Sequence, residues 1–324
     1  MKVLYIGEPQ THEKYLKGIV PSHWLYGACE MERDGHDVIW EQESGELFHD
    51  IRLLKKHKPD IVFIPNLNIG HHKLLLAKKA LGLCNTPVYA YLHHGRPSRT
   101  GIGAKIIRFL LSGVNHLFFL SQKSMAETTA GGYVDADKCS CPDWGPDMDF
   151  YGKVPVCDNG RFVSTGKENR DFDILIEAFK QTGAPLTIMT ARAHGDNDYS
   201  DLKKRCKDIS NIEVVITENT GDVYPKMLKA MADARALVCP LMTDRLSYCV
   251  GLSTIADAEG LGKQLIITKN PYHDRHRIKD FNQVVSVQDW VDAINGINKK
   301  FKNGNSTGIS MQSAYEQMSK VLFG

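Results

Sequence analysis

Two basic residues near the middle of the chain have the types and spacing of a phosphate-binding pair. Lys167 and Arg170 lie in the segment Ser164-Thr-Gly-Lys-Glu-Asn-Arg-Asp171, which follows an expected strand and precedes an amphipathic helical pattern. At a strand end, two such cations can hold a diphosphate and neutralise the negative charge that develops on it as a bond breaks. The alternative is a solvent-exposed basic loop.

A second segment, Gly251-Leu-Ser-Thr-Ile-Ala-Asp257, has the pattern of a glycine turn that opens a helix. Backbone N–H groups at Ser253 and Thr254 would be free there, at the positive end of the helix dipole, and together they make an anion site. Asp257 comes later in the helix, where its carboxylate can accept hydrogen bonds from two ribose hydroxyls but would not suit a phosphate. The alternative for this acid is an ordinary surface charge.

Histidines follow two other expected strands. His93 and His94 end a strand of the first half, where a histidine can hydrogen-bond a sugar hydroxyl or move a proton near neutral pH. A structural role is the alternative for a histidine at a strand end. The basic segment His273-Asp-Arg-His-Arg277 follows the last expected strand, and solvation is favoured there over phosphate contact.

The elements that must position these residues follow from the hydrophobic period. Short β-branched or aromatic runs alternate with helical patterns, which predicts parallel, doubly wound sheets in an α/β protein. Strands are expected in the first half at 2–7, 37–40, 60–65, 87–93 and 116–121, and in the second half at 161–164, 186–190, 213–217, 236–240 and 264–268.

The alternation stops over the proline- and glycine-marked segment 139–147, which predicts a domain boundary. We therefore expect a Rossmann-like first domain over residues 1–150 and a second over 151–305. The helical segment at 306–324 has no strand after it and is expected to pack back on the first domain. Ligands of open parallel sheets bind beyond the carboxyl ends of the strands, so the cleft between the two domains is the expected binding place.

Composition limits the classes of function. The 324 residues are 42% hydrophobic and 24% charged, which is typical of a globular protein, and the length favours two domains. A formal net charge of +2 gives no overall electrostatic footprint for nucleic acid. Eight scattered cysteines and a first segment without the apolar length of a secretory signal predict reduced thiols and a cytoplasmic location.

Two kinds of bound group are not expected. The close pair Cys139-Ser-Cys141 lacks the second half of a zinc site, so no metal is predicted. The first strand is followed by Gly7-Glu-Pro-Gln-Thr instead of Gly-x-Gly-x-x-Gly, which argues against a nicotinamide cofactor.

One segment has the pattern of a helix at a membrane surface. Residues 102–111 combine an apolar face with Lys105 and Arg108, and core packing of an ordinary wound helix explains the same pattern. No window approaches the roughly 18 apolar residues of a membrane span.

Taken together, the segments resemble the GT-B glycosyltransferases, in particular the retaining, nucleotide-sugar-dependent family 4. The resemblance covers most of the chain in order, and no single motif carries it. The matching segments are Gly18-Ile-Val-Pro-Ser-His-Trp24, Glu32-Arg-Asp-Gly-His-Asp-Val38, Trp144-Gly-Pro-Asp147 with Phe150, Thr165-Gly-Lys-Glu-Asn-Arg-Asp171 and Val223-Tyr224 through Leu241.

The most informative match is the stretch that holds Asp257. Members of the family carry two glutamates separated by seven residues, and the second is followed by Ala and then by Gly-x-Pro and an apolar strand. Asp257-Ala258 and Gly262-Lys-Gln-Leu-Ile-Ile267 are similar to that second half, with Asp for Glu and Gln264 for Pro. The first glutamate falls at Cys249, so either Asp244 serves in its place or the protein manages without that acid, and retention stays open.

The resemblance implies transfer of a hexose from a nucleotide diphosphate sugar to a hydroxyl of a glycan or lipid-linked acceptor, as in polysaccharide biosynthesis. No metal or cofactor is needed in this scheme, and the partners are the nucleotide sugar, the acceptor and, through residues 102–111, the inner face of a membrane. A sugar-nucleotide epimerase of similar architecture and a non-catalytic nucleotide-sugar-binding subunit are the alternatives. Catalytic roles are expected for His93, His94, Lys167 and Arg170, and donor binding for Gly166, Lys167, Arg170, Tyr224, Gly251, Leu252, Ser253, Thr254 and Asp257.

Overall fold

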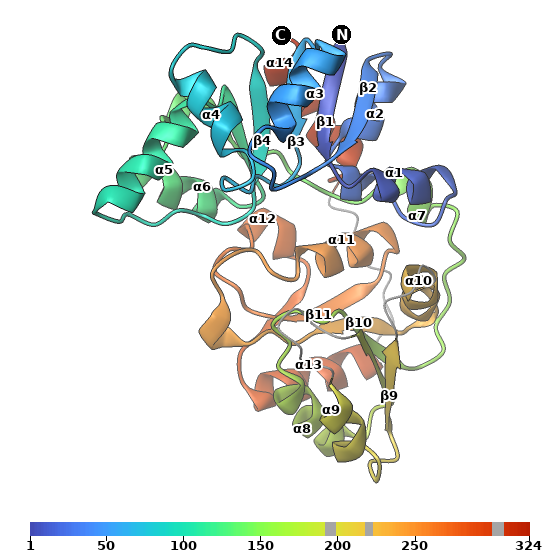
Figure 1. Ribbon diagram of the computed structural model, residues 1–324. Helices are drawn as coiled ribbons and strands as arrows, with labels where there is room; N and C mark the ends of the chain where they lie inside the picture. Colours follow the sequence, from blue (N-terminus) through green and yellow to red (C-terminus); the bar gives the residue numbers. More distant parts are fainter. Residues whose placement is uncertain (192–198, 218–222, 300–307) are drawn as a thin grey trace. The chain divides into compact units, whose positions relative to one another are not determined.

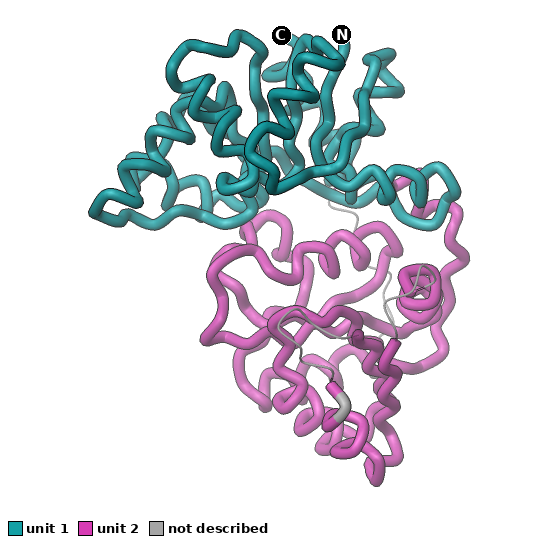
Figure 2. Tube along the Cα trace, viewed as in Figure 1, with its two compact units in different colours: residues 1–147, 309–324 teal, residues 148–308 magenta. Residues whose placement is uncertain are grey.

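The chain folds into two compact α/β units, as the sequence predicts. The computed structural model describes residues 1–191, 199–217, 223–299 and 308–324. Unit 1 comprises Met1–Asp147 with Ile309–Gly324, and unit 2 comprises Met148–Gly308 (Figures 1 and 2). The boundary expected after residue 150 falls inside helix α7 (Met148–Tyr151), and the one expected between 305 and 306 lies outside the described residues.

Unit 1 is built on a six-stranded sheet in the order β2-β1-β3-β4-β5-β6, with every pair parallel. Its strands are β1 (Lys2–Gly7), β2 (Asp37–Gln42), β3 (Ile61–Ile64), β4 (Val88–Leu92), β5 (His116–Phe119) and β6 (Cys139–Ser140). Its helices are α1 (Pro9–Leu16), α2 (Ala28–Arg33), α3 (His49–His57), α4 (Lys73–Ala80), α5 (Ile102–Ser112), α6 (Gln122–Ala130) and α14 (Met311–Leu322), with 3-10 turns η1 (Ser22–Leu25) and η2 (Ala136–Lys138).

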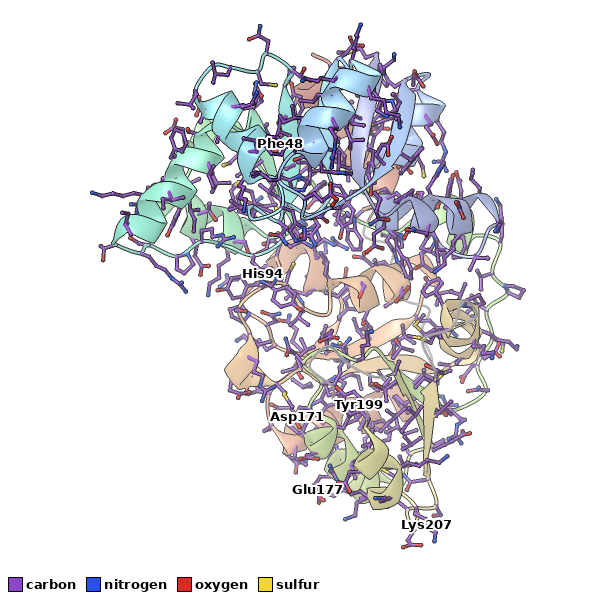
Figure 3. All side chains as sticks on the ribbon, viewed as in Figure 1. Phe48, His94, Asp171, Glu177, Tyr199 and Lys207 are labelled. Atoms are coloured by element: carbon purple, nitrogen blue, oxygen red, sulfur yellow. The ribbon has the colours of Figure 1, made fainter. Side chains whose placement is uncertain are left out.

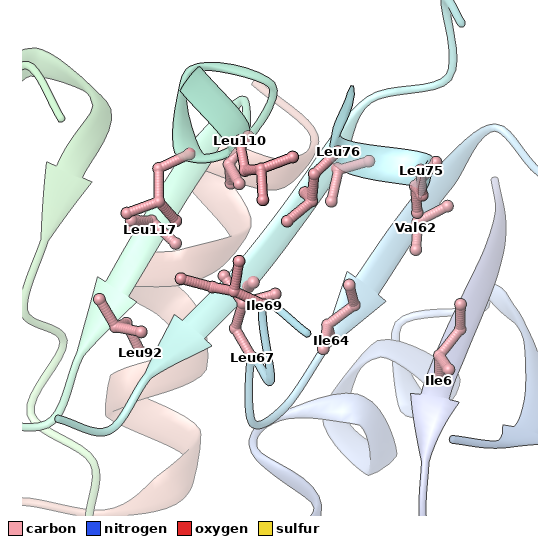
Figure 4. Close-up of a cluster of buried hydrophobic side chains, with 14 of the residues drawn as sticks. Ile6, Val62, Ile64, Leu67, Ile69, Leu75, Leu76, Leu92, Leu110 and Leu117 are labelled. Atoms are coloured by element: carbon pink, nitrogen blue, oxygen red, sulfur yellow. The ribbon is translucent and has the colours of Figure 1, made fainter. Parts of the chain in front are cut away.

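The core of unit 1 lies between the sheet and its helices. All four residues of β3 are buried, as expected for a central parallel strand that is covered on both faces. Ile64 packs in one cluster with Leu76 of α4 and Leu110 of α5 (Figure 4). Truncating one such side chain to alanine would lower the free energy of unfolding by about 2–5 kcal/mol. The sheet is therefore a rigid support for the loops at its edge.

The C-terminal helix α14 completes unit 1. The Tyr315 hydroxyl donates to Asp34 Oδ2 at 2.7 Å, and Met318 Sδ accepts from the Tyr91 hydroxyl at 3.1 Å. Ser310 caps the helix by accepting from the Ser313 N–H, which satisfies one of its otherwise unpaired donors. Residues more than 200 positions apart in the sequence therefore share one core.

Unit 2 has a second six-stranded parallel sheet, in the order β12-β11-β10-β7-β8-β9. Its strands are β7 (Phe162–Thr165), β8 (Leu186–Ala191), β9 (Ile212–Thr217), β10 (Ala236–Cys239), β11 (Gln264–Thr268) and β12 (Asn282–Val284). Besides α7, its helices are α8 (Phe172–Thr182), α9 (Ser200–Arg205), α10 (Val223–Asp233), α11 (Leu252–Gly260), α12 (Arg275–Ile278) and α13 (Val287–Lys299), with the 3-10 turn η3 (Thr243–Arg245).

Candidate functional site

The strand order of unit 2 reverses between β7 and β10. The chain runs from β7 outward through β8 and β9, and then returns to place β10 on the other side of β7. Loops at such a switch point diverge to opposite faces and leave a crevice where ligands of open α/β sheets bind. The loop after β7 carries Gly166 to Arg170, and the loop after β10 leads to Gly251, so the two predicted anion-binding segments come from this point.

The loop after β7 closes on the guanidinium of Arg170. Arg170 is 5% exposed and donates from Nη1 to the Glu168 carbonyl at 2.7 Å and from Nε to the Thr165 carbonyl at 3.4 Å. Gly166 has a φ of +101°, and a Cβ at this position would lie 2.4 Å from Arg170 Nη2. Glycine therefore permits the closed loop, and the arginine retains further N–H groups for an anion because a guanidinium has five donors. Lys167 lies in the same loop and is partly exposed.

Backbone contacts join this loop to the one after β10. Arg170 forms an antiparallel bridge with Leu241, and the Met242 N–H donates to the Asn169 carbonyl at 2.9 Å. Leu241 in turn packs at the helix start, where its Cδ1 would lie 3.4 Å from a Cβ on Gly251. The two segments that the sequence nominates separately are therefore connected through Leu241 and Met242 within unit 2.

Helix α11 begins with free donors. Gly251 precedes it with a φ of +92°, and among the described residues no carbonyl accepts from the backbone N–H of Ser253 or Thr254. The Leu252 N–H already donates to the Cys249 carbonyl at 3.1 Å, and its side chain is buried. Ser253 and Thr254 are thus the residues whose N–H groups can meet an anion at this helix start.

Asn270 and His273 hold the loop before α11 in place. No sequence pattern predicts a role for Asn270, and His273 is buried although solvation is expected for its segment. Asn270 Nδ2 donates to the Tyr248 and Val250 carbonyls at 3.0 and 3.2 Å, and His273 Nε2 lies 2.8 Å from the same Val250 oxygen. Because a carbonyl only accepts, the proton of His273 is on Nε2. Burial lowers the pKa of His273 to about 4, so the ring is neutral and positions the backbone.

Asp257 lies in a buried cluster with two tyrosines. Its Oδ1 accepts from the Tyr151 hydroxyl of α7 at 2.6 Å and from the Tyr224 hydroxyl of α10 at 3.0 Å. Burial raises the pKa of Asp257 to about 6, although both hydrogen bonds act to lower it. Within the described residues Asp257 Oδ2 accepts no hydrogen bond, which leaves that oxygen available to hydroxyl donors of a ligand.

No sequence pattern predicts Tyr151 as a residue of the candidate site. It lies 106 positions before Asp257, and a local pattern does not reveal a contact at that range. One local signal is Gly260, near the end of α11, because a Cβ there would lie 2.2 Å from the Tyr151 ring. The glycine makes room for the tyrosine, which fixes the carboxylate in turn.

The surface-charge alternative for Asp257 and the solvation expected for Arg277 are both wrong. Asp257 is 7% exposed, and Glu259 on the same helix is 6% exposed. Glu259 pairs with Arg277, at 2.6 Å from Nη2 to Oε2 and 3.3 Å from Nε to Oε1, so Arg277 is also buried instead of solvated. The bidentate geometry satisfies both charges, which compensates for their removal from water and ties α12 to α11.

Cys249 does not replace the acid that the resemblance places there. The side chain is 4% exposed, and burial raises the pKa of the thiol to about 12, so it is neutral near pH 7. Asp244 lies in the exposed turn η3 of the loop after β10, beside Arg245. Of these two positions, only Asp244 offers a carboxyl group.

His93 and His94 belong to unit 1, whereas the other predicted site residues belong to unit 2. His93 Nε2 lies 3.0 Å from the Pro65 carbonyl, and burial lowers the pKa of His93 to about 4 despite that contact. A neutral ring with its proton on Nε2 is not a proton donor of the imidazolium kind near pH 7. His94 is exposed at the end of β4 (Figure 3).

Two α/β units, each built on a parallel six-stranded sheet, define the class of protein as the GT-B fold. No protein-family model and no curated protein matches the sequence.

Solved structures are similar along the whole chain. AviGT4, a glycosyltransferase involved in Avilamycin A biosynthesis, is 12% identical over 100% of this chain and 99% of its own, with a TM-score of 0.61. UDP-GlcNAc 2-epimerase from Neisseria meningitidis, bound to UDP-GlcNAc, is 13% identical over 99% of both chains, with a TM-score of 0.59. Anabaena Alr3699/HepE in complex with UDP is 14% identical over 99% and 96%, with a TM-score of 0.59. These similarities show the fold.

Proposed function

We propose that the chain is a glycosyltransferase that moves a sugar from a nucleotide diphosphate sugar to a hydroxyl of a glycan or lipid-linked acceptor. The observation that carries the proposal is the placement of Asp257 on the helix whose start offers the free N–H groups of Ser253 and Thr254. One helix thus presents an anion site and, about one turn further along, a carboxylate with a free oxygen. A nucleoside diphosphate has the matching groups, phosphates next to a ribose with two hydroxyls.

Each residue has a defined role in this proposal. The N–H groups of Ser253 and Thr254 bind diphosphate oxygens, and Lys167 and Arg170 neutralise the charge that develops on the leaving diphosphate. Asp257 Oδ2 accepts from a ribose hydroxyl, while Tyr151 and Tyr224 keep the carboxylate in place. The protein's own cations stabilise the leaving group, so the proposal uses no metal or cofactor.

The position of Cys249 bears on the stereochemistry. A transferase of the retaining family 4 type carries an acid there, and a neutral buried thiol supplies no such charge. In this proposal Asp244 takes that role from the loop after β10. Asp244→Asn would then reduce turnover and leave binding of the nucleoside diphosphate unchanged, whereas equal turnover by this variant would remove Asp244 from the site.

A sugar-nucleotide epimerase is the second candidate, because the epimerase from Neisseria meningitidis and AviGT4 match the chain about equally well. A non-catalytic nucleotide-sugar-binding subunit is the third, and the neutral Cys249 favours it. Incubation with a panel of nucleotide sugars, with and without hydroxyl acceptors, separates the three by mass spectrometry and chromatography. A transferase releases free nucleoside diphosphate, and an epimerase releases an isomerised nucleotide sugar. A binding subunit leaves the nucleotide sugar unchanged.

We also propose that α5 contacts the cytoplasmic face of a membrane. Ile102, Ile106 and Phe109 lie on one face of the helix and are 80%, 52% and 43% exposed, so core packing does not account for them. Lys105 is exposed beside them and would attract anionic headgroups. None of the helices in the described part of the chain has the length and apolarity to cross a bilayer. Cosedimentation with anionic liposomes at low salt is expected for the wild type and not for Ile102→Ser/Phe109→Ser.

A further inference from the structure

Unit 1 contains a cluster of three potential metal ligands away from the sugar-nucleotide residues. His12 is on α1, and Cys29 and Glu32 are one turn apart on the same face of α2. One ring nitrogen of His12, the Cys29 Sγ and a carboxylate oxygen of Glu32 all lie within 4.8 Å of one another. His12 Nε2 and Glu32 Oε2 are 3.3 Å apart.

The imidazole of His12 is directed at this cluster without a hydrogen bond. Its Nε2 is buried and has no hydrogen-bond partner among the described residues, and the nearby Glu32 oxygen is not in hydrogen-bonding geometry. Buried polar atoms are rarely left unpaired, so this atom calls for a partner. A metal ion at the centre of the cluster would satisfy it.

Trp40 orients two of the three ligands. Its indole lies against the His12 ring, with centroids 3.8 Å apart and planes 10° from parallel. Its Nε1 donates to Glu32 Oε1 at 2.8 Å, which leaves Oε2 facing His12. Metal sites typically have such outer contacts, because they fix the direction of the ligand atoms before the ion binds.

The surroundings of Cys29 favour a cation. The side chain is 1% exposed, and its sulfur lies within 4.8 Å of a Glu32 carboxylate oxygen. A divalent ion would displace the thiol proton and compensate that carboxylate. The overall step is Cys-SH plus a divalent cation giving a metal thiolate and one released proton.

We propose that His12, Cys29 and Glu32 bind one transition-metal ion of the zinc class, with water as the fourth ligand. A nitrogen, a sulfur and an oxygen ligand suit zinc, whereas magnesium and calcium prefer oxygen alone. Tetrahedral bonds of about 2.0–2.3 Å place ligand atoms roughly 3.3–3.8 Å apart. The histidine and glutamate atoms already meet that spacing, and the sulfur needs to move by about 1 Å or less.

The ion would add a link between two helices that the hydrogen bond from Arg33 to the Tyr15 hydroxyl already joins. Helix α1 has no buried residue of its own, and the metal would tie it more closely to α2. The expectation that the chain binds no metal rested on the pair Cys139 and Cys141, which this site does not use. The proposal is independent of sugar transfer, because none of the residues assigned to that reaction takes part.

The test is a titration of the full, reduced chain with Zn²⁺ and with Co²⁺ after dialysis against a chelator. One equivalent should bind, Co²⁺ should give a thiolate-to-cobalt charge-transfer band, and Zn²⁺ should raise the melting temperature. Cys29→Ser should abolish the band, and Cys29→Ser, His12→Gln and Glu32→Gln should each weaken Zn²⁺ binding at least tenfold. Cys157→Ser, at an exposed thiol, is the matched control and should bind as the wild type does.

Trp40→Phe keeps the ring stack but removes the N–H donor to Glu32, so it should weaken Zn²⁺ binding by about 10- to 100-fold. This variant keeps the proposal falsifiable if Cys29→Ser does not fold, which circular dichroism would reveal. The proposal is overturned if the folded wild type binds no Zn²⁺, if the cobalt band persists in Cys29→Ser, or if Trp40→Phe binds Zn²⁺ as tightly as the wild type.

Discussion

The hydroxyl of Tyr151 donates a 2.6 Å hydrogen bond to Asp257, across 106 positions of sequence. Tyr151 lies on α7, the first helix of unit 2, and Asp257 lies on α11. This contact sets the direction of the carboxylate on which the proposed nucleotide site depends.

Tyr151→Phe removes this donor and keeps the ring that packs against Gly260. Loss of one hydrogen bond to a buried carboxylate is expected to cost about 1–3 kcal/mol in stability. Binding of uridine diphosphate should weaken several-fold, because the carboxylate loses its fixed direction. Urea denaturation and calorimetric titration measure the two effects. Tyr89→Phe, in unit 1, is the control, and equal nucleotide affinity in wild type and Tyr151→Phe would remove the tyrosine from the site.

The raised pKa of Asp257 predicts a pH dependence of nucleotide binding. Burial raises this pKa from 3.8 to about 6, and a ribose hydroxyl donates a stronger hydrogen bond to the ionised carboxylate than to the protonated acid. Affinity for a nucleoside diphosphate should therefore fall by up to about tenfold per pH unit below pH 6. Titrations between pH 5 and 7.5 test this, after allowance for phosphate protonation measured with Asp257→Asn. A wild-type profile identical to that of Asp257→Asn would contradict the assignment.

The buried His72 predicts that unit 1 loses stability at high pH. Burial alone would lower its pKa, but the hydrogen bond to Asp50 at 3.0 Å and the Glu43 carboxylate 3.5 Å from Nε2 outweigh burial and raise the pKa to about 9. Because the folded-state pKa exceeds the unfolded value of 6.5, this stabilisation is fully present below pH 6.5 and is lost as pH rises through 9.

The loss amounts to about 3 kcal/mol at most. Urea denaturation of the wild type at pH 6.5 and pH 9.5 should show it, and His72→Gln should show a smaller difference. Equal stability of the wild type at the two pH values would rule out a charged His72 in the folded state.

Gly166→Ala should disturb the loop that closes on Arg170. The backbone conformation with φ of +101° is unfavourable for alanine, and the new Cβ would clash with the guanidinium. We expect a loss of about 1–3 kcal/mol in stability together with weaker nucleotide binding. Gly296→Ala is the matched control in the same unit, because nothing lies within 4 Å of its Cβ and the helix should gain roughly 1 kcal/mol. Equal affinity in wild type and Gly166→Ala would show that this loop does not bind the ligand.

The sequence predicts every strand in the described part of the chain except β6 and β12. The predicted bounds of β1 and β11 coincide with the observed ones, because these strands are continuous apolar runs. Strands β6 and β12 have two and three residues, too few for a periodic pattern. Helix α1 buries no residue and has no apolar face to read, although Pro9 at its first position is a helix-start signal.

The candidate site is predictable where its residues follow strands directly. Gly166 to Arg170 and Gly251 to Thr254 come from loops that the strand pattern identifies, and their proximity follows from the switch point. The supporting contacts of Tyr151 and Asn270 depend on how distant segments pack, which the pattern does not specify. Likewise, the Glu259–Arg277 ion pair is invisible in a sequence that shows only two charges 18 positions apart.

The role of Asp257 in nucleotide binding is tested by calorimetric titration of wild type, Asp257→Asn and the surface control Asp292→Asn with a panel of nucleoside diphosphates. Wild type and Asp292→Asn are expected to bind one equivalent of a nucleoside diphosphate with equal affinity. Asp257→Asn should stay folded, gain stability at pH 7 by losing a buried charge, and bind at least tenfold more weakly. Equal binding by all three proteins, or no binding of any nucleoside diphosphate to the wild type, would contradict the proposed nucleotide site.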